Sequence, residues 1–152
     1  MSQLSFALSR FVSPSQPALV NSANIRARIF VHDSSRLHAV SLSQPVALIA
    51  SSTTSPALDC GQTVCFTLTD ITSIAFELVG FTLQNGFSAS DGGAILSVNS
   101  RISLVDVTIA NSRALRRGGA LTLQAGSIAQ LMNVQLLGNS ANDAAGALFA
   151  AD

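Results

Sequence analysis

The sequence of 152 residues contains no tryptophan, no tyrosine and no lysine, and charged residues make up only 11% of it. Its eight arginines balance seven aspartates and one glutamate, so the formal net charge is zero. Because there is no basic excess, nothing in the composition would attract nucleic acid or an anionic membrane. The absence of lysine is as compatible with codon bias as with surface chemistry, and it therefore carries no functional weight.

Long apolar runs are also missing. The longest, such as Val46–Ala50, is far shorter than the roughly 20 residues that a membrane-spanning helix needs, so we expect no transmembrane helix. The first residues have no basic start, and their apolar stretch breaks at Ser9 and Arg10, which makes them a poor signal peptide. Either the chain is not secreted in the form given, or its native N-terminus lies further upstream.

Cysteine is scarce, with Cys60 and Cys65 as the two examples. In an extended segment they would lie about 16 Å apart, at roughly 3.3 Å per residue, which is beyond disulfide reach unless Gly61 and Gln62 form a turn. Two separate thiols are the favoured interpretation, and a disulfide is the alternative. Without a second cysteine pair or a nearby histidine, the two residues do not form a zinc site.

What the sequence does contain is a threefold internal repeat. The first repeated element begins at Leu78, Leu104 and Leu131. The second, a glycine-rich step into a small apolar strand, begins at Gly92, Gly118 and Ala145. Both elements recur with spacings of 26 and then 27 residues. Two independent markers with one period predict a stacked solenoid rather than a globule.

Short runs rich in β-branched and aromatic residues predict the strands of this solenoid. Upstream of the repeat they cover Ile29–Val31, Leu37–Leu42, Val46–Ala50, Val64–Leu68 and Ile74–Leu78. Within the repeat, apolar and polar residues alternate apart from one shift in phase near Val105, as expected where a strand passes a bend and its inward face is reset. Asn85, Asn111 and Gly138 close the repeated strands, where a left-handed backbone is expected.

The sequence therefore predicts an all-β chain that forms a right-handed parallel β-helix of about five turns, with three short strands per turn. Residues 1–24, which include Pro14 and Pro17, are expected to form a loose or capping segment. Residues 25–152 are expected to form the β-helix domain, truncated at its C-terminal end. A helical alternative exists for Ser112–Leu115 and Ala144–Ala151, but each interior glycine would cost a helix roughly 1 kcal/mol.

Catalysis by a β-helix that cleaves polysaccharides needs two or three carboxylates that converge on one face. Here the carboxylates are dispersed over Asp59, Asp70, Asp91, Asp106 and Asp143. Asp91 and Arg117 each precede a glycine pair, so we expect them to stack in adjacent turns as an exposed ion pair, which contributes little to stability. Asp106 aligns with Gly80 and Asn133, so no carboxylate ladder is expected there.

Two further groups of residues carry chemistry of interest. His32 and His38 are the only histidines, and both lie before the clear repeats. His32, Asp33 and Ser34 are the residue types of a hydrolase triad, but neighbours on a strand point to opposite faces. The other group is a small basic patch of Arg113, Arg116 and Arg117 on one loop. We interpret it as part of a solvated turn, and a site for a sulfated or acidic glycan is the alternative. We therefore predict no catalytic, cofactor-binding or metal-binding residue and no cofactor.

The repeat resembles that of the polymorphic outer-membrane-protein family and of the wider group of right-handed β-helix surface proteins. The motifs that carry the resemblance are Gly92-Gly-Ala-Ile95, Gly118-Gly-Ala-Leu121 and Gly138-Asn-Ser-Ala141, within about residues 57–149. The sequence departs from the family where a Phe-x-x-Asn motif is replaced by Leu83-Gln-Asn85 and Ile109-Ala-Asn111. The resemblance implies a β-helix fold and an extracellular or cell-surface location.

We therefore expect a non-catalytic scaffold that belongs to a surface or extracellular protein and serves adhesion or carbohydrate binding. The alternative is a truncated or degenerate β-helix of the polysaccharide lyase or hydrolase type, whose site lies outside this sequence. Carbohydrate or another surface protein is the expected partner. Because the last turn ends without a polar cap, end-to-end self-association through that turn is a further hypothesis, as is continuation of the β-helix in a longer chain.

Overall fold

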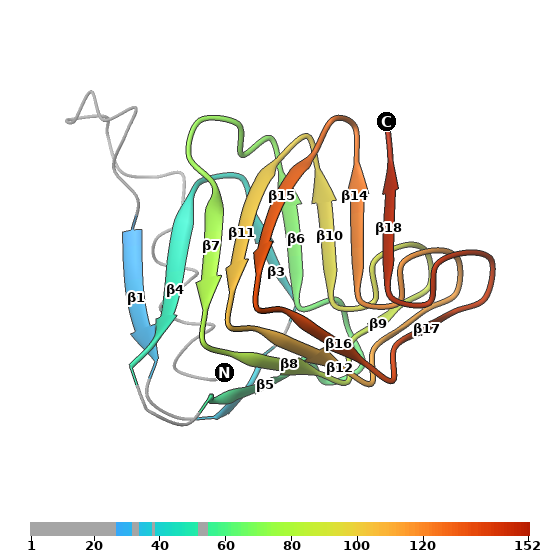
Figure 1. The fold of residues 1–152 in the computed structure, drawn as a ribbon, viewed down its shortest axis with the longest axis horizontal. Helices are drawn as coiled ribbons and strands as arrows, with labels where there is room; N and C mark the ends of the chain where they lie inside the picture. Colours follow the sequence, from blue (N-terminus) through green and yellow to red (C-terminus); the bar gives the residue numbers. More distant parts are fainter. Residues whose placement is uncertain (1–26, 32–33, 38, 52–54) are drawn as a thin grey trace.

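The computed structural model describes residues 27–31, 34–37, 39–51 and 55–152 (Figure 1). Within these residues the chain is all-β, and no helix is present. It follows that the described part of the chain offers no helix that could cross a membrane. The segment 1–24, expected to be loose or capping, lies outside the described residues.

Three parallel sheets of five strands each run along the molecule. Sheet A consists of β1 (Ala27–Val31), β4 (Val46–Ala50), β7 (Phe76–Val79), β11 (Arg101–Val105) and β15 (Ile128–Met132). Sheet B consists of β2 (Ser35–Arg36), β5 (Ala57–Asp59), β8 (Thr82–Gln84), β12 (Thr108–Ala110) and β16 (Gln135–Leu137). Sheet C consists of β3 (Val40–Leu42), β6 (Phe66–Thr69), β10 (Ile95–Val98), β14 (Leu121–Gln124) and β18 (Leu148–Ala151).

A fourth sheet, sheet D, is smaller and was not expected from the sequence. It contains the two-residue strands β9 (Phe87–Ser88), β13 (Arg113–Ala114) and β17 (Ser140–Ala141). A complete turn of the chain passes through sheets A, B, D and C in that order, as β7, β8, β9 and β10 show (Figure 1). The molecule is thus a parallel β-solenoid of about four turns, compared with the five or so expected from the sequence.

The register between neighbouring turns confirms the sequence repeat. Leu78 pairs with Leu104, and Leu104 pairs with Leu131. In sheet C, Ile95 pairs with Leu121, and Leu121 with Leu148, which reproduces the spacings of 26 and 27 residues. The helical alternative for the last segments is wrong, because they form β13 and β18.

The corners of the solenoid use a left-handed backbone. Asn85, Asn111 and Gly138 have φ angles of 59°, 51° and 60°, as expected from their positions at strand ends. Asp106, with a φ of 53°, forms the bend between β11 and β12. This bend explains the shift in phase near Val105, because Leu104 before it and Val107 after it are both buried.

Columns of aliphatic side chains fill the interior. Leu48, Leu78 and Leu104 lie in one column on sheet A, and each is fully buried. Burial of each such side chain stabilises the fold by roughly 1.5 to 3 kcal/mol. Near the N-terminal end, the rings of Phe66 and Phe76 join sheets C and A, with centroids 5.2 Å apart.

The connection between sheets B and C lengthens along the chain. It joins Leu37 to Val40 in one turn, Cys60 to Phe66 in the next, and Asn85 to Ile95 in the third. The third connection is the first that is long enough to contain a strand of sheet D. The solenoid is therefore narrower in its first turns, and its outline gains a fourth side at β9.

A disulfide between Cys60 and Cys65 closes the short connection of the second turn. The favoured interpretation of two separate thiols was therefore wrong. Gly61 and Gln62 have φ angles of 59° and 65°, which forms the turn that the alternative required and brings the two Cα atoms to 5.0 Å. Both cysteines are fully buried.

Candidate functional site

The histidines of interest, His32 and His38, and Asp33 lie outside the described residues. Of the three residue types that suggested a hydrolase triad, the structure describes Ser34. Its hydroxyl oxygen accepts a hydrogen bond from the backbone N–H of Ala57, one turn along, at 3.0 Å. This contact gives Ser34 a role in joining turns.

Three aspartates each accept a hydrogen bond from an asparagine one turn further along the solenoid. Asn133 Nδ2 donates to Asp106 Oδ1 at 2.7 Å, which confirms the alignment predicted from the repeat. The other two pairs are Asn99 with Asp70 at 2.7 Å and Asn85 with Asp59 at 3.3 Å. These carboxylates are spaced along the solenoid, and no group of three or more potential metal ligands occurs among the residues that the structure describes.

Asp91 and Arg117 form an ion pair between adjacent turns. The guanidinium donates from Nη2 to Asp91 Oδ2 at 2.8 Å and from Nε to Oδ1 at 3.1 Å. The backbone N–H of Arg117 also donates to Oδ1 at 3.1 Å. The predicted stacking of these residues in adjacent turns is confirmed. Their expected exposure was wrong for the carboxylate, because Asp91 is only 4% exposed.

The position of this ion pair against sheet C explains its burial. Gln124, at the end of β14, donates from Nε2 to Asp91 Oδ2 at 2.9 Å. Thr122, on the same strand, donates its hydroxyl to the carbonyl oxygen of Arg117 at 3.0 Å. The guanidinium carbon of Arg117 lies 4.5 Å from the ring centre of Phe149 on β18. The corner loop is thus held by groups from three successive turns.

These contacts shift the pKa values of both partners in the directions that favour their charged forms. The hydrogen bond from Arg117 lowers the pKa of Asp91, and burial opposes this effect. The positive charges of Arg117 and Arg116 and the hydrogen bond from Gln124 lower the same pKa further. The hydrogen bond to Asp91 raises the pKa of Arg117. An aspartate held in its charged form by four donors is poorly suited to proton transfer at neutral pH, so the arrangement is structural.

The basic patch expected at Arg113, Arg116 and Arg117 is reduced by these contacts. Arg117 is neutralised by Asp91, and Arg113 donates from Nη2 to Asn142 Oδ1 at 3.3 Å. Arg116 and Arg113 are exposed. The structure therefore does not bring three free guanidinium groups together at this corner.

The last turn, formed by β15, β16, β17 and β18, is open to solvent. Four of its apolar side chains are exposed: Ile128 (51%), Leu131 (41%), Met132 (62%) and Leu137 (51%). Leu131 lies in the same column as Leu104, which is fully buried. Leu131 is exposed because no further turn covers it in this structure. In Figure 1 these four strands form one end of the solenoid.

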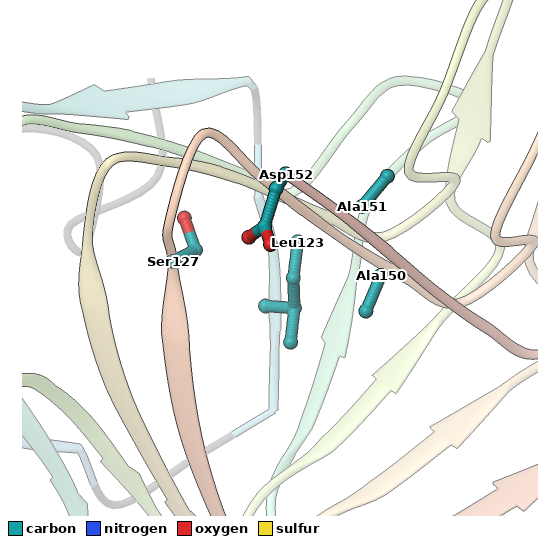
Figure 2. Close-up of a pocket in the computed structure, with 5 residues that line it drawn as sticks. All are labelled: Leu123, Ser127, Ala150, Ala151 and Asp152. Atoms are coloured by element: carbon teal, nitrogen blue, oxygen red, sulfur yellow. The ribbon is translucent and has the colours of Figure 1, made fainter.

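A shallow hollow of about 190 Å³ lies at this end (Figure 2). It is lined by Leu123, Ser127, Ala150, Ala151 and Asp152. The hydroxyl of Ser127 donates to the carbonyl oxygen of Gln124 at 2.7 Å and accepts from the backbone N–H of Ser100 at 3.1 Å. With this hydroxyl engaged, Asp152 contributes the one charged side chain, and the hollow has no converging set of catalytic groups.

Gln124 and Phe149 are the contacts of the Asp91 corner that sequence reasoning missed. The repeat register places Phe149 beside Thr122 and could have identified the strand. That the corner loop packs against the outer face of this strand follows from the tertiary structure alone. No buried side-chain nitrogen or oxygen atom in the described part of the chain lacks a hydrogen-bond partner, so no unsatisfied polar group indicates a ligand.

The parallel β-solenoid is the part of the sequence-based resemblance that the structure supports. The finer resemblance, to the polymorphic outer-membrane-protein repeats, rests on the short sequence motifs. Comparisons with protein families, with curated proteins and with solved structures find no match to this chain.

Proposed function

We propose that this chain is a non-catalytic β-helix scaffold within an extracellular or cell-surface protein, where it serves adhesion through carbohydrate binding. The observation that carries this proposal is the use of the carboxylates. Asp59, Asp70, Asp91 and Asp106 each bind a side chain from the following turn. Groups that a glycosidase or lyase would direct at a substrate are here used to hold adjacent turns together.

The Cys60–Cys65 disulfide supports the extracellular part of this proposal. Disulfides persist in oxidising compartments and are rare in the cytosol, where thiols are kept reduced. Both cysteines are fully buried in the second turn, which shields the bond from reductants in solvent.

The outer face of sheet B is the surface best suited to a carbohydrate. Thr82 pairs with Thr108, and Thr108 with Gln135, so hydroxyl and amide groups repeat along this face at the strand spacing of about 4.8 Å. All three are at least partly exposed and carry no charge. Uncharged donors and acceptors at a regular spacing complement the hydroxyl groups of a repeating polysaccharide.

Affinity electrophoresis through gels that contain single neutral or acidic polysaccharides tests the proposal. We expect at least one polysaccharide to retard the protein, and we expect Thr82→Ala/Thr108→Ala to reduce the retardation severalfold. Thr67→Ala on sheet C is the matched control and should leave it unchanged. If none retards the protein, or if all three proteins behave alike, the carbohydrate proposal is wrong. Release of new reducing or unsaturated sugar ends from the same polysaccharides would instead support the enzymatic alternative.

A further inference from the structure

Asn85 and Gly86 form a chemically labile step of the chain between β8 and β9 (Figure 1). Asn85 is the one asparagine in the sequence that a glycine follows. Asparagine is among the thermolabile residues of proteins. The loss of its side-chain amide is fastest before glycine, because the next backbone nitrogen attacks the side chain and glycine has no Cβ to obstruct that attack.

The geometry of this corner imposes both residues of the pair. Asn85 has a φ of 59°, a left-handed conformation that asparagine adopts more readily than most residues. At Gly86, a Cβ would clash with the carbonyl oxygen of Gly93 and lie 2.8 Å from the Cα atom of Ala94. The labile pair is therefore a consequence of the fold.

In the folded protein, the two reacting groups are bound to different turns. Asn85 Nδ2 donates to Asp59 Oδ1 in the preceding turn at 3.3 Å. The backbone N–H of Gly86 donates to Ser112 Oγ in the following turn at 3.1 Å, in a buried contact. The Gly86 nitrogen must lose its proton and meet the Asn85 side chain before it can react, so the corner must first open.

We propose that the Asn85–Gly86 step is a deamidation site that the folded solenoid protects and that reacts when this corner unfolds. The Gly86 nitrogen bonds to Asn85 Cγ, the C–N bond of the side-chain amide breaks, and ammonia leaves. Water then opens the resulting succinimide ring at either carbonyl carbon, which leaves aspartate or isoaspartate at position 85. One water is consumed and one ammonia is released, with no oxidant or cofactor. This inference is independent of the proposed carbohydrate binding.

Either product disturbs the contact between turns. Aspartate at position 85 sets a second carboxylate beside Asp59 in place of a hydrogen-bond donor, and like charges repel. Isoaspartate adds one methylene to the backbone between β8 and β9. Because these strands pair in register with β12 and β13, the additional backbone atom disrupts one of the two pairings. The modification thus hinders refolding and marks chains that have unfolded.

Peptide mapping by mass spectrometry tests the proposal, because conversion of an amide to an acid changes the peptide mass. The full chain is incubated at mildly alkaline pH, either folded in buffer or unfolded in guanidinium chloride. We expect Asn85 to deamidate first in the unfolded chain and slower by about tenfold or more in the folded protein. Asn111 lies at the equivalent corner with a φ of 51° but precedes a serine, so it should react more slowly than Asn85 in the unfolded chain.

Ser112→Ala tests the protective contact, because it removes the acceptor of the Gly86 N–H. We expect this variant to deamidate severalfold faster at Asn85 in buffer and at the parent rate in denaturant. Ser100→Ala is the matched control, since Ser100 Oγ accepts a buried N–H bond from Ile71 in the preceding turn at 3.0 Å. It should raise the rate at Asn85 in buffer less. If Ser112→Ala does not fold by circular dichroism, the parent in buffer and in denaturant still decides the proposal.

Three results would overturn the proposal. Equal rates at Asn85 in buffer and denaturant would show that the fold protects nothing. No reaction at Asn85 in the unfolded chain, or earlier reaction at another asparagine, would show that the site is assigned wrongly. Chains modified in denaturant should also recover less native circular dichroism on refolding than briefly unfolded chains, and full recovery would show that the products fit the corner.

Discussion

Arg117 lies one turn beyond Asp91 and binds its carboxylate through three N–H groups, two from the guanidinium and one from the backbone. Both residues directly precede a glycine with a positive φ, Gly92 in one turn and Gly118 in the next. The ion pair therefore fixes these two glycine corners relative to each other. Because the carboxylate is buried, the pair differs from the exposed contact that the sequence suggested.

Replacement of this carboxylate should destabilise the fold. Asp91→Asn removes the charge and places an amide NH₂ group against the donors of Arg117 and Gln124, which leaves buried donors without acceptors. We expect the urea midpoint of unfolding to fall clearly. Asp106→Asn, at an exposed corner that also binds a side chain from the next turn, is the control and should shift the midpoint much less. Equal shifts would show that burial of Asp91 adds nothing.

Stability should also depend on pH through Asp91. Its folded pKa lies below the ordinary value of 3.8, mainly because of the hydrogen bond from Arg117, so the unfolded chain binds this proton more readily. The contribution is fully present above the unfolded pKa and is lost as the pH falls through the folded pKa. Urea unfolding at a series of pH values below about 5 should therefore show a steeper loss of stability for the parent protein than for Asp91→Asn. Parallel curves would contradict this expectation.

The glycine corners should tolerate substitution only at the end of the solenoid. A Cβ at Gly93 would clash with the carbonyl oxygen of Gly119 and lie 2.8 Å from the backbone nitrogen of Arg113, neither of which can move freely. We expect Gly93→Ala to cost about 3 kcal/mol or more of unfolding free energy.

Gly146 is the matched control for Gly93, because it occupies the equivalent corner of the last turn. A Cβ there comes no closer than 3.3 Å to its nearest neighbour, the carbonyl oxygen of Asn139. Gly146→Ala should cost no more than about 1 kcal/mol by denaturant unfolding. Similar costs at the two positions would show that contact between turns does not impose the glycine.

The disulfide should stabilise the narrow part of the solenoid. Cys60→Ala/Cys65→Ala removes a link across a short loop, for which the loss of chain entropy on cross-linking predicts about 2 kcal/mol of unfolding free energy. Mass spectrometry after thiol alkylation of the unfolded, unreduced protein should show no free cysteine in the parent. Alkylation of both cysteines, or equal stability of parent and variant, would contradict the structure on this point.

Much of the fold could be predicted from particular residues. The recurrence of Leu78, Leu104 and Leu131 predicted one column of sheet A, and the register confirms it. Asp106 and Asn133 were aligned correctly from the same repeat. These predictions succeeded because equivalent residues of a solenoid must stack at the strand spacing, so that a period in the sequence becomes a position in space. Sheet D was missed because two-residue strands produce no alternation.

The sequence by itself determined the parallel stacking, the register and the left-handed corners at Asn85, Asn111 and Gly138, because these depend on local backbone preference and on a periodic apolar pattern. Only the tertiary structure decided the burial of Asp91, since that requires a corner loop to pack against Gln124 and Phe149 from other turns. The disulfide was decided in the same way, because Cys60 and Cys65 meet only where Gly61 and Gln62 form a tight turn in the connection between two sheets. Contacts that depend on how a loop folds back have no period in the sequence, and the three-dimensional packing alone specifies them.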